Sequence, residues 1–361
     1  MKTNFYNVIG AMSGTSLDGL DLAFCEFRFE NSQWNYNIVI AETIEYSDVL
    51  KERLKNAVNV SGLALALLNS DYGHFLGQAI QKFIQKNNLQ VDLISIHGHT
   101  IFHQTEKKLT LQIGDGAAVA SYVKCPAVAQ FRNIDVALGG QGAPLVPIGD
   151  KLLFNTVDFR LNLGGIANIS FTENEKTIAF DIGVCNMALN SLVFVKNLLF
   201  DKNGAIAASG TLNSDLLSQL NGLDFFKQSP PKSLGFEWFE TNFLPILNGS
   251  DCSLADQLHT VCEHIAEQIS NVVNGQENVS EKTMLVTGGG AKNDFLMSKI
   301  KQHCLCKIEE TNPLIIDFKE ALIFAFLGVL RLRGEVNCLA DVTGATRDNI
   351  GGCVYLGSGL A

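Results

Sequence analysis

Four glycine-rich segments follow apolar, β-type runs and carry small polar residues suited to binding phosphate. Glycine lets the backbone turn tightly and approach a ligand closely. Because the segments occur in both halves of the chain, we expect the strand ends to converge on one cleft. The segments are NVIGAMSGTSLDG (7–19), LNLGGIANIS (161–170), IAFDIGVCN (178–186) and MLVTGGGAKN (284–293).

The first segment has the composition of a phosphate loop in a hairpin turn. The patterns G-x-x-x-x-G-K-[ST] and G-x-G-x-x-G are both absent from the chain. Hydroxyls of Ser13, Thr15 and Ser16 are available for phosphate, and Asp18 and Asp21 could hold Mg²⁺ through water. An ordinary β-turn containing Asp and Gly is the alternative for this segment alone.

Three histidines lie close together in the chain, at His97, His99 and His103. Zinc sites rarely consist of His-x-His without a third ligand at helical or loop spacing. The sequence therefore disfavours a metal site here.

Composition limits the class of protein. The chain has 361 residues, of which 47% are hydrophobic and 18% charged, with a formal net charge of −10. An acidic surface argues against nucleic acid and membrane surfaces as partners. The longest apolar run, Ala321–Leu330, is shorter than the ~18 residues of a membrane span. Nine cysteines without a C-x-x-C pair indicate reduced thiols in the cytoplasm.

The elements that must position these segments form a coarse internal repeat. The first glycine turn returns as strands over 20–29 and 36–46, and the second over 168–172 and 176–181. One or two helices are predicted over 61–86, and another over Leu254–Val273, where Gly275 is a stop signal. Asn293 can cap a following helix, and Asp317–Glu320 resembles a capping box before a helix over 321–332. The pattern predicts a duplicated α/β protein divided near 135–147.

A series of longer motifs follows in fixed order from Gly10 to about Gly352. The motifs are GAMSGTSLDGLD, HGHTIFH, LQIGDGAAVA, FRNIDVALGGQGAPLVP, LNLGGIANIS, DKNGAIAASG, PPKSLGFEWF, VTGGGAKN, EALIFAFLGVL and VTGA. In this order they resemble the motifs of the anhydro-N-acetylmuramic acid kinase family. The resemblance implies an α/β fold of two ribonuclease-H-like domains of actin-like ATPase type, with an interdomain nucleotide cleft. We expect one domain over 1–137 plus about 340–361 and the other over 138–339.

The resemblance also implies a reaction and its setting. Water opens the 1,6-anhydro bond of anhydro-N-acetylmuramic acid while O6 is phosphorylated by ATP with Mg²⁺, which gives N-acetylmuramic acid 6-phosphate for cell-wall recycling. A cytoplasmic homodimer is implied, with no nucleic acid or membrane partner.

The family pattern assigns roles to particular residues. Asp181 is the implied catalytic base, whose alternative role is capping a turn, and Glu320 is the second catalytic carboxylate, whose alternative is the capping box. Arg132, which could clamp the lactyl carboxylate, or else form a surface or interdomain ion pair, and Asp135 are the implied sugar-binding pair. The other implied sugar-side residues are His97, Thr100, Gln112, Gly114 and Gly116. The implied nucleotide loops comprise Gly14, Thr15, Ser16, Leu17, Asp18, Gly19, Leu20, Asp21, Gly164, Gly165, Asn168, Gly183, Gly288, Gly289, Gly290 and Asn293, with Asp18 and Asp21 at Mg²⁺.

Several residues depart from the family pattern. Ile182, Val184 and Cys185 replace Thr, Pro and Gly; Leu234 and Phe236 replace Thr and Arg; and His99 stands where Gln is usual. We expect Ile182 to remove a possible phosphate contact and Cys185 to add bulk near the ligand. Three alternatives to the kinase stay open: an ATP-binding relative with altered or lost sugar chemistry, such as a regulatory or chaperone-like ATPase; a filament-forming actin relative; and a sugar-binding pseudo-enzyme.

Overall fold

Two compact units make up the chain in the computed structural model, which describes residues 4–14, 17, 19–174, 176–230 and 232–357. The first unit extends to Phe154 and resumes at Phe318, and the second comprises Asn155–Asp317. The sequence predicted these divisions at 137/138 and near 339/340. They fall at 154/155 and 317/318 because helix α5 (Val146–Leu153) and the part of α14 from Phe318 onward pack with the first unit.

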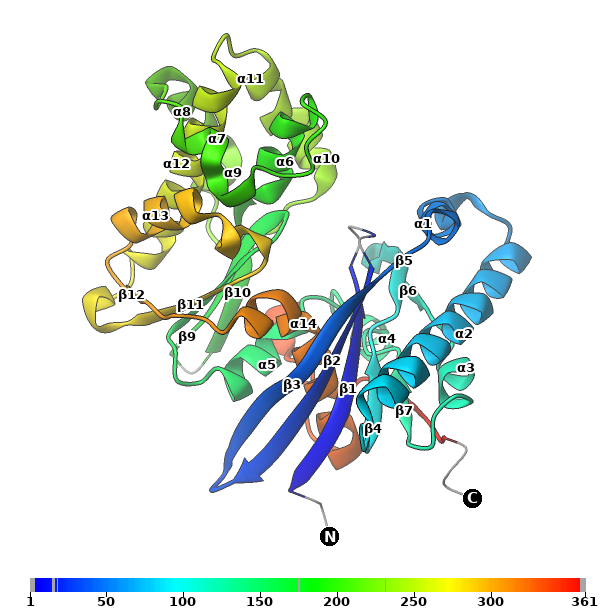
Figure 1. The fold of residues 1–361 in the computed structure, drawn as a ribbon. Helices are drawn as coiled ribbons and strands as arrows, with labels where there is room; N and C mark the ends of the chain where they lie inside the picture. The colour runs from blue at the N-terminus through cyan, green and yellow to red at the C-terminus, as the bar shows by residue number, and fades with distance from the viewer. Residues whose placement is uncertain (1–3, 15–16, 18, 175, 231, 358–361) are drawn as a thin grey trace. The chain divides into compact units, whose positions relative to one another are not determined.

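The first unit is built on a six-stranded sheet in the order β13-β7-β4-β1-β2-β3 (Figure 1). Strands β1 to β3 form an antiparallel meander, whereas β4 lies parallel to β1 and β7 parallel to β4. The strands are β1 (Phe5–Ser13), β2 (Gly19–Glu30), β3 (Gln33–Glu45), β4 (Leu93–Ile96), β7 (Ala127–Ala129) and β13 (Cys353–Tyr355).

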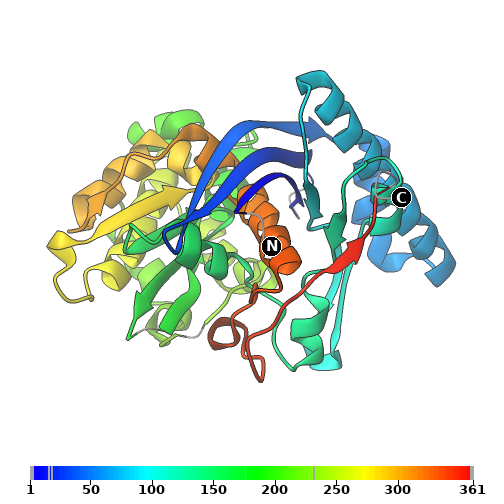
Figure 2. The ribbon, with the colours of Figure 1, turned by 90° about the horizontal axis from the view of Figure 1, so that it is seen from below.

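Two long helices cover opposite faces of this sheet because side chains alternate along β1 (Figures 1 and 2). Ile9 and Ala11 belong to a core cluster with α2 (Gly62–Asn87). On the other face, a Cβ on Gly10 would lie 1.9 Å from the carbonyl oxygen of Ala321 in α14 (Pro313–Arg333). Gly10 is therefore required where α14 contacts the strand.

The remaining elements of the first unit are short. A separate hairpin of β5 (His99–Gln104) and β6 (Leu109–Ile113) follows β4. The other helices are α1 (Asp48–Lys55), α3 (Gly116–Ala120), α4 (Asn133–Ala137), α15 (Ala340–Thr343) and the 3₁₀ turns Ala57–Asn59 and Thr105–Lys107.

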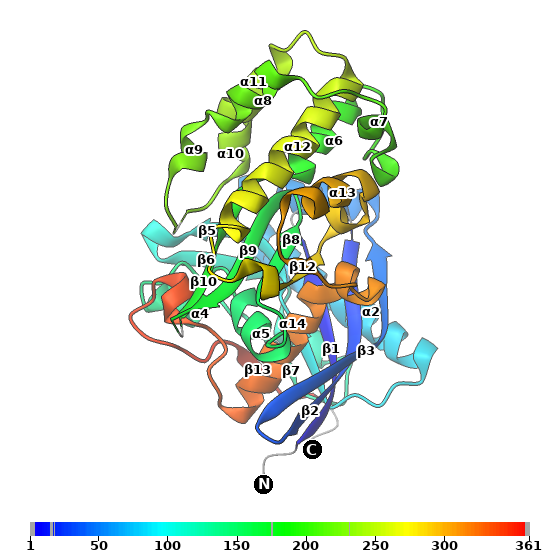
Figure 3. The same cartoon turned by 90° about the vertical axis from the view of Figure 1, so that its left-hand side faces the viewer.

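The second unit repeats the topology of the first with a five-stranded sheet in the order β10-β9-β8-β11-β12 (Figure 3). Its strands are β8 (Phe159–Leu163), β9 (Ile166–Glu173), β10 (Lys176–Val184), β11 (Thr283–Thr287) and β12 (Lys307–Ile308). An antiparallel meander is again followed by parallel strands, so the predicted duplication is confirmed as two ribonuclease-H-like sheets.

The helices of the second unit, except α9 (Asp224–Lys227), contribute side chains to one core cluster with the sheet. Those that contribute are α6 (Asn186–Phe194), α7 (Ala205–Ala208), α8 (Ser214–Asn221), α10 (Phe236–Trp238), α11 (Leu244–Asn248), α12 (Leu254–Val273) and α13 (Asp294–His303). A π-helical turn spans Phe239–Phe243, and 3₁₀ turns span Lys202–Gly204, Val279–Glu281 and Gly289–Lys292.

The predicted helix signals are confirmed in three places and wrong in one. Helix α12 has the predicted bounds, α2 (Gly62–Asn87) differs by one residue at each end from the predicted 61–86, and Asn293 caps α13 through the backbone N–H of Leu296 at 3.0 Å. The capping box at Asp317–Glu320 is wrong because α14 begins earlier, at Pro313. At that point the helix is kinked instead, since Phe318 has non-helical dihedral angles (φ −119°, ψ 16°).

Two general expectations can be compared with the structure. Within the described ranges, no helix has the length and apolar character needed to cross a membrane. All nine cysteines are unpaired.

Candidate active site

The carboxyl ends of the parallel strands β1 and β4 bring distant polar residues together in the first unit. The backbone N–H of His97 donates to the carbonyl oxygen of Ala11 at 3.0 Å. Ser13, the last residue of β1, lies against His99, the first residue of β5, with its Oγ 2.9 Å from Nδ1 of the imidazole. The first glycine loop and the HGHT segment are therefore neighbours.

The guanidinium of Arg132 is held by one neutral histidine and one carbonyl. His97 Nδ1 donates to the carbonyl of Gly98 at 2.9 Å, so its Nε2 is free to accept from Arg132 Nε at 3.1 Å and Nη2 at 2.8 Å. Arg132 Nη1 donates to the carbonyl of Gly142 at 2.6 Å. Burial and the nearby cation hold the pKa of His97 well below its usual value.

Arg132 thus keeps a charge that none of these partners neutralises. Burial lowers its pKa to about 10, which leaves the guanidinium protonated at neutral pH. A half-buried cation with uncharged hydrogen-bond partners is suited to an anionic ligand group.

Asp135 is completely buried and organises the loop that holds Arg132. One oxygen accepts from the backbone N–H of Gly142 at 2.7 Å. The other accepts from Cys338 Sγ at 3.0 Å and from Thr343 Oγ1 and Asn349 Nδ2, both at 2.8 Å. This geometry favours a positioning role for Asp135 over the direct sugar contact that the family resemblance implied.

Glu320 lies in the electrostatic field of Arg132 and of the first glycine segment. Glu320 is exposed to solvent, yet enough protein surrounds the carboxyl group for desolvation to raise its pKa. Arg132 and Lys319 oppose this shift and Asp21 adds to it. Lys319 itself is bound in a buried ion pair with Asp150 at 2.7 Å.

The rest of the sugar-side set occupies the β5–β6 hairpin and the loop after it. Gln112 Nε2 donates to Thr110 Oγ1 at 2.9 Å and to Thr100 Oγ1 at 3.4 Å. Gly114 has a left-handed backbone (φ 119°) and donates to Asn69 of α2. Gly116 leaves room for the ring of Tyr355, which a Cβ would approach to 2.4 Å. Local packing thus accounts for both glycines.

The first glycine loop is only partly open to description, because Thr15, Ser16 and Asp18 lie outside the described residues. Gly19 packs against β3, where a Cβ would lie 2.6 Å from the carbonyl oxygen of Ile44. Asp21 accepts a hydrogen bond from Thr43 Oγ1 at 2.6 Å. Elsewhere in the described ranges, no three His, Cys, Asp or Glu side chains gather as metal ligands.

Asp181 is the reactive carboxylate candidate of the second unit. It lies in β10 beside a β-bulge, where the pairing with β9 shifts between Asp181 and Gly183. The segment after Pro231 fixes it, since Asp181 N donates to the carbonyl of Lys232 at 3.1 Å and Leu234 N donates to Asp181 Oδ2 at 2.9 Å. Desolvation raises the pKa of Asp181, against the opposing effect of the Leu234 N–H.

The second glycine turn is braced by the start of α6. The carbonyls of Gly164 and Gly165 accept from the backbone N–H groups of Asn186 and Met187 at 3.1 and 3.0 Å. A Cβ on exposed Gly165 would have only the Met187 side chain as a neighbour, at 3.8 Å. The outer side of this turn is therefore open, and Asn168 lies further along β9, paired with Asp181.

The triple glycine packs against the end of β8. Gly288 has a left-handed backbone (φ 82°), and a Cβ there would lie 2.6 Å from Asn162 Oδ1. Gly290 faces Leu163 at 2.7 Å, whereas Gly289 has only Asn186 Nδ2 at 3.9 Å. Two glycines are thus needed for packing, and the middle one borders open space beside the second glycine turn.

The departures in DIGVCN point into the protein. Ile182, Val184 and Cys185 belong to the hydrophobic core of the second unit, and Cys185 is fully buried. The expected loss of a phosphate contact at Ile182 and added bulk near a ligand at Cys185 are therefore wrong. Gly183 packs against Phe226, which a Cβ would approach to 2.8 Å.

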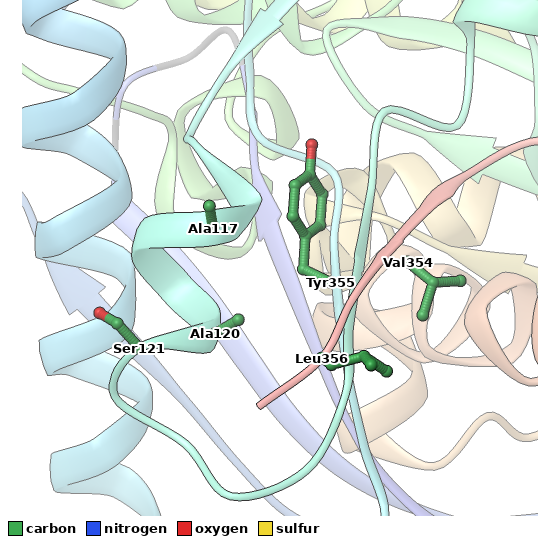
Figure 4. Close-up of a pocket in the computed structure, with 6 residues that line it drawn as sticks. All are labelled: Ala117, Ala120, Ser121, Val354, Tyr355 and Leu356. Carbon is green, nitrogen blue, oxygen red and sulfur yellow. The ribbon is translucent and has the colours of Figure 1, made fainter. Parts of the chain in front are cut away.

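Sequence reasoning missed the side chains that support these candidates. Tyr46 and Tyr72 form a buried hydrogen-bonded pair behind Ser13, and Asn186 Nδ2 holds the carbonyl of Leu163 at 2.8 Å. Helical spacing could mark Tyr72 as buried, but no pattern signals which hydroxyl it meets. A pocket of about 490 Å³ between α3 and β13 contains none of the candidate residues (Figure 4).

Each unit thus presents glycine turns and charged groups at the ends of parallel strands, the arrangement of a two-domain α/β protein that binds a phosphorylated ligand. The model of the anhydro-N-acetylmuramic acid kinase family matches residues 6–357. The chain belongs to this family and is an enzyme of the phosphotransferase class.

Individual relatives are similar over nearly the whole chain. The anhydro-N-acetylmuramic acid kinase of Pasteurella multocida (strain Pm70) is 35% identical, with 98% of each chain covered. That of Vibrio cholerae serotype O1 is 34% identical, covering 96% of this chain and 97% of the relative.

Solved structures are more distant. The activator of 2-hydroxyisocaproyl-CoA dehydratase from Clostridium difficile has a TM-score of 0.46 at 13% identity, covering 91% of this chain and 96% of that one. A glucokinase of the ROK family from Streptomyces griseus has a TM-score of 0.41 at 10% identity, covering 89% and 99%.

Gly165→Ala tests whether the open glycine turn borders the nucleotide. The added methyl group has room in the structure, so we expect an unchanged thermal midpoint. A phosphate close to the turn would be obstructed, which predicts an ATP dissociation constant raised about threefold or more. Calorimetric titration measures this, with Gly62→Ala in α2 as the control. Unchanged affinity in a folded variant would remove Gly165 from the site.

Proposed function

We propose that this enzyme converts 1,6-anhydro-N-acetylmuramic acid, ATP and water to N-acetylmuramic acid 6-phosphate and ADP. The main support is the state of Asp181. Desolvation raises the pKa of its carboxyl group, and the backbone N–H of Leu234 holds the group in place. The turn at Gly164–Gly165, whose outer side is open, lies in the same sheet. The family membership supports the same substrate, and no comparison favours an ATPase without sugar chemistry.

Asp181 acts as the general base for the attacking water. It takes one proton as the water oxygen bonds to C1, the C1–O6 bond breaks, and O6 bonds to the γ-phosphorus while ADP leaves. A desolvated carboxylate is a better base than a solvated one because its conjugate acid is weaker. The hydrogen bond from Leu234 N to Oδ2 leaves Oδ1 for the water.

The first unit binds and orients the sugar. Arg132, fixed by His97 and Gly142, pairs with the lactyl carboxylate, and Asp135 holds the loop that carries Gly142. Thr100 and Gln112 form the adjoining wall of the sugar site, and Gly114 and Gly116 determine the backbone path of the loop that follows it. Glu320, whose carboxyl group interacts with the charge of Arg132, is proposed to face the reacting sugar.

ATP is the second substrate, held by the glycine turns at Gly14–Asp21, Gly164–Asn168 and Gly288–Asn293, with Gly183 beside them. Mg²⁺ would neutralise charge on the transferred phosphoryl group. Asp18 and Asp21 are its proposed ligands through water, which fits the preference of Mg²⁺ for few carboxylates and several waters. Carboxylate oxygens and water are donor types that suit this ion.

The setting of the reaction is also a proposal. The substrate is a product of cell-wall turnover, so we place the enzyme in peptidoglycan recycling in the cytoplasm. We further propose that the enzyme forms a homodimer and that it binds neither nucleic acid nor membranes. The acidic charge of −10 supports the last point.

Incubation with Mg-ATP and the anhydro sugar in ¹⁸O water tests the reaction. Mass spectrometry should show a sugar phosphate carrying one ¹⁸O, with ADP in equal amount. ATP binding without a sugar product would contradict the proposed function.

Asp181→Asn should lower kcat by at least about 10², the low end for a lost general base. Asparagine keeps an oxygen that can accept from Leu234 N, so we expect the fold to be retained. Steady-state kinetics and the thermal midpoint measure the two effects, with Asp224→Asn on the exposed α9 as the control. Wild-type kcat in the variant would exclude Asp181 as the base.

The pH dependence of kcat/KM should have an acidic limb above the usual pKa of aspartate. The base works only when unprotonated, and desolvation raises its pKa, so activity falls as protonation begins at a higher pH. A profile over about pH 4–8 measures this for the wild type and Glu320→Gln. Loss of the limb in Glu320→Gln would assign it to Glu320 instead.

Arg132→Ala should raise KM for the sugar about tenfold or more and leave KM for ATP nearly unchanged, since a charge-assisted hydrogen bond is lost. Arg53→Ala, on the surface of α1, is the matched control. Equal effects on both substrates would indicate a structural arginine.

A further inference from the structure

A buried chain of hydroxyl groups ends on the imidazole of His99. Tyr46 OH donates to Ser13 Oγ at 2.7 Å, and the hydroxyls of Tyr46 and Tyr72 are also 2.7 Å apart. Ser13 Oγ in turn lies 2.9 Å from His99 Nδ1. The exposed fractions are 3% for Tyr46, 0% for Tyr72, 2% for Ser13 and 5% for His99, so water does not compete for these bonds.

The direction of the chain follows from counting its protons. Tyr46 donates its hydroxyl proton to Ser13. In the bond between the two tyrosines, Tyr72 must therefore be the donor and Tyr46 the acceptor. Ser13 accepts from Tyr46 and must place its own proton elsewhere. Two acceptors lie near Ser13 among the residues that the structure describes: His99 Nδ1, at 2.9 Å, and the hydroxyl of Tyr72. The imidazole nitrogen is the stronger acceptor because it is far more basic than a phenol oxygen, and a buried hydroxyl left unpaired would be costly. Ser13 therefore donates to Nδ1.

This direction determines the tautomer of His99. A ring nitrogen that accepts a proton from Ser13 carries none of its own, so neutral His99 is protonated on Nε2. Burial lowers the pKa of His99, which keeps the ring neutral at pH 7. Within the described part of the chain, Nε2 has no hydrogen-bond partner.

We propose that His99 is a substrate-binding residue whose Nε2–H donates to an oxygen of the sugar, with Ser13, Tyr46 and Tyr72 as positioning residues that fix its tautomer. The assignment rests on the proposed function for the identity of the sugar. His99 is the first residue of the hairpin that also carries Thr100 and Gln112, and it is two residues from the partner of Arg132.

The chemistry of the position favours a neutral donor. Both nitrogens of a charged imidazole carry a proton, so a charged His99 could not accept a hydrogen bond from Ser13. The proton of the Ser13 hydroxyl would then point at the proton on Nδ1. A neutral N–H suits a hydroxyl or carbonyl oxygen of a sugar, which needs orientation more than charge. Glutamine is the conservative replacement because its amide also ends in an N–H donor.

Nuclear magnetic resonance tests the tautomer without any reaction. The protein is labelled with ¹⁵N-histidine, and the His99 signals are identified by their loss in His99→Gln. Long-range ¹H–¹⁵N correlations at pH 7 should show Nε2 protonated and Nδ1 unprotonated. In Ser13→Ala the donor to Nδ1 is gone, so the Nδ1–H tautomer should also appear. An Nδ1–H tautomer or a charged ring in the wild type would overturn the proposal.

Kinetics tests the contact with the sugar. His99→Leu should raise KM for the sugar about three- to tenfold, the effect of one neutral hydrogen bond, and leave KM for ATP within about twofold. His99→Gln should restore KM to within about twofold of the wild type. His74→Leu, at an exposed position on α2, is the matched control. An unchanged sugar KM in His99→Leu, or a raised KM for ATP alone, would overturn the proposal.

The two hypotheses fail in different ways. If the wild type turns over the sugar and His99→Leu does so with the same KM, the proposed function stands and this inference fails. If the wild type gives no product, the proposed function fails. The His99 Nε2 signal is then followed on adding the anhydro sugar, and the absence of a shift would exclude His99 as a sugar donor as well.

Discussion

Parallel pairing of the central strand in each unit is the constraint on which the candidate site depends. Strand β1 is paired with β4, and β8 with β11, although the partners are far apart in the chain. Because parallel strands end at the same edge of a sheet, the turn after the first strand must meet the loop after the second. Ser13 therefore meets His99, and the turn at Gly164 lies beside the triple glycine.

Uncharged partners explain how the first unit can keep the half-buried guanidinium of Arg132 available. His97 is held neutral by burial and by Arg132 itself, so it orients the guanidinium without cancelling its charge. The one carboxylate in this loop, that of Asp135, is taken up by four other donors and directs Gly142 toward Arg132. The positive charge of Arg132 is thus available to a ligand. Loss of His97 or of Asp135 would change the orientation of the guanidinium but would leave its charge in place.

The sequence allowed prediction of features that recur with a period or follow a local rule. The duplicated meander, the bounds of α12 and the cap at Asn293 are of this kind. The start of α14 was mispredicted because the Asp317–Glu320 pattern also occurs inside a helix, here beside the kink at Phe318. The chain from Tyr72 to His99 depends on side chains that only tertiary packing brings together, which no local pattern encodes.

The departures from the family pattern fall into two physical groups. Those around Asp181 point into the core, since alternation along β10 places Ile182 among apolar side chains while the bulge beside it leaves the carboxylate to Leu234 N. They alter packing and not the groups that face a ligand. Phe236 differs, because it is 54% exposed where the family has a cation. A change in substrate preference would therefore be expected from Phe236 and from His99, whereas Ile182, Val184 and Cys185 change only the packing behind Asp181.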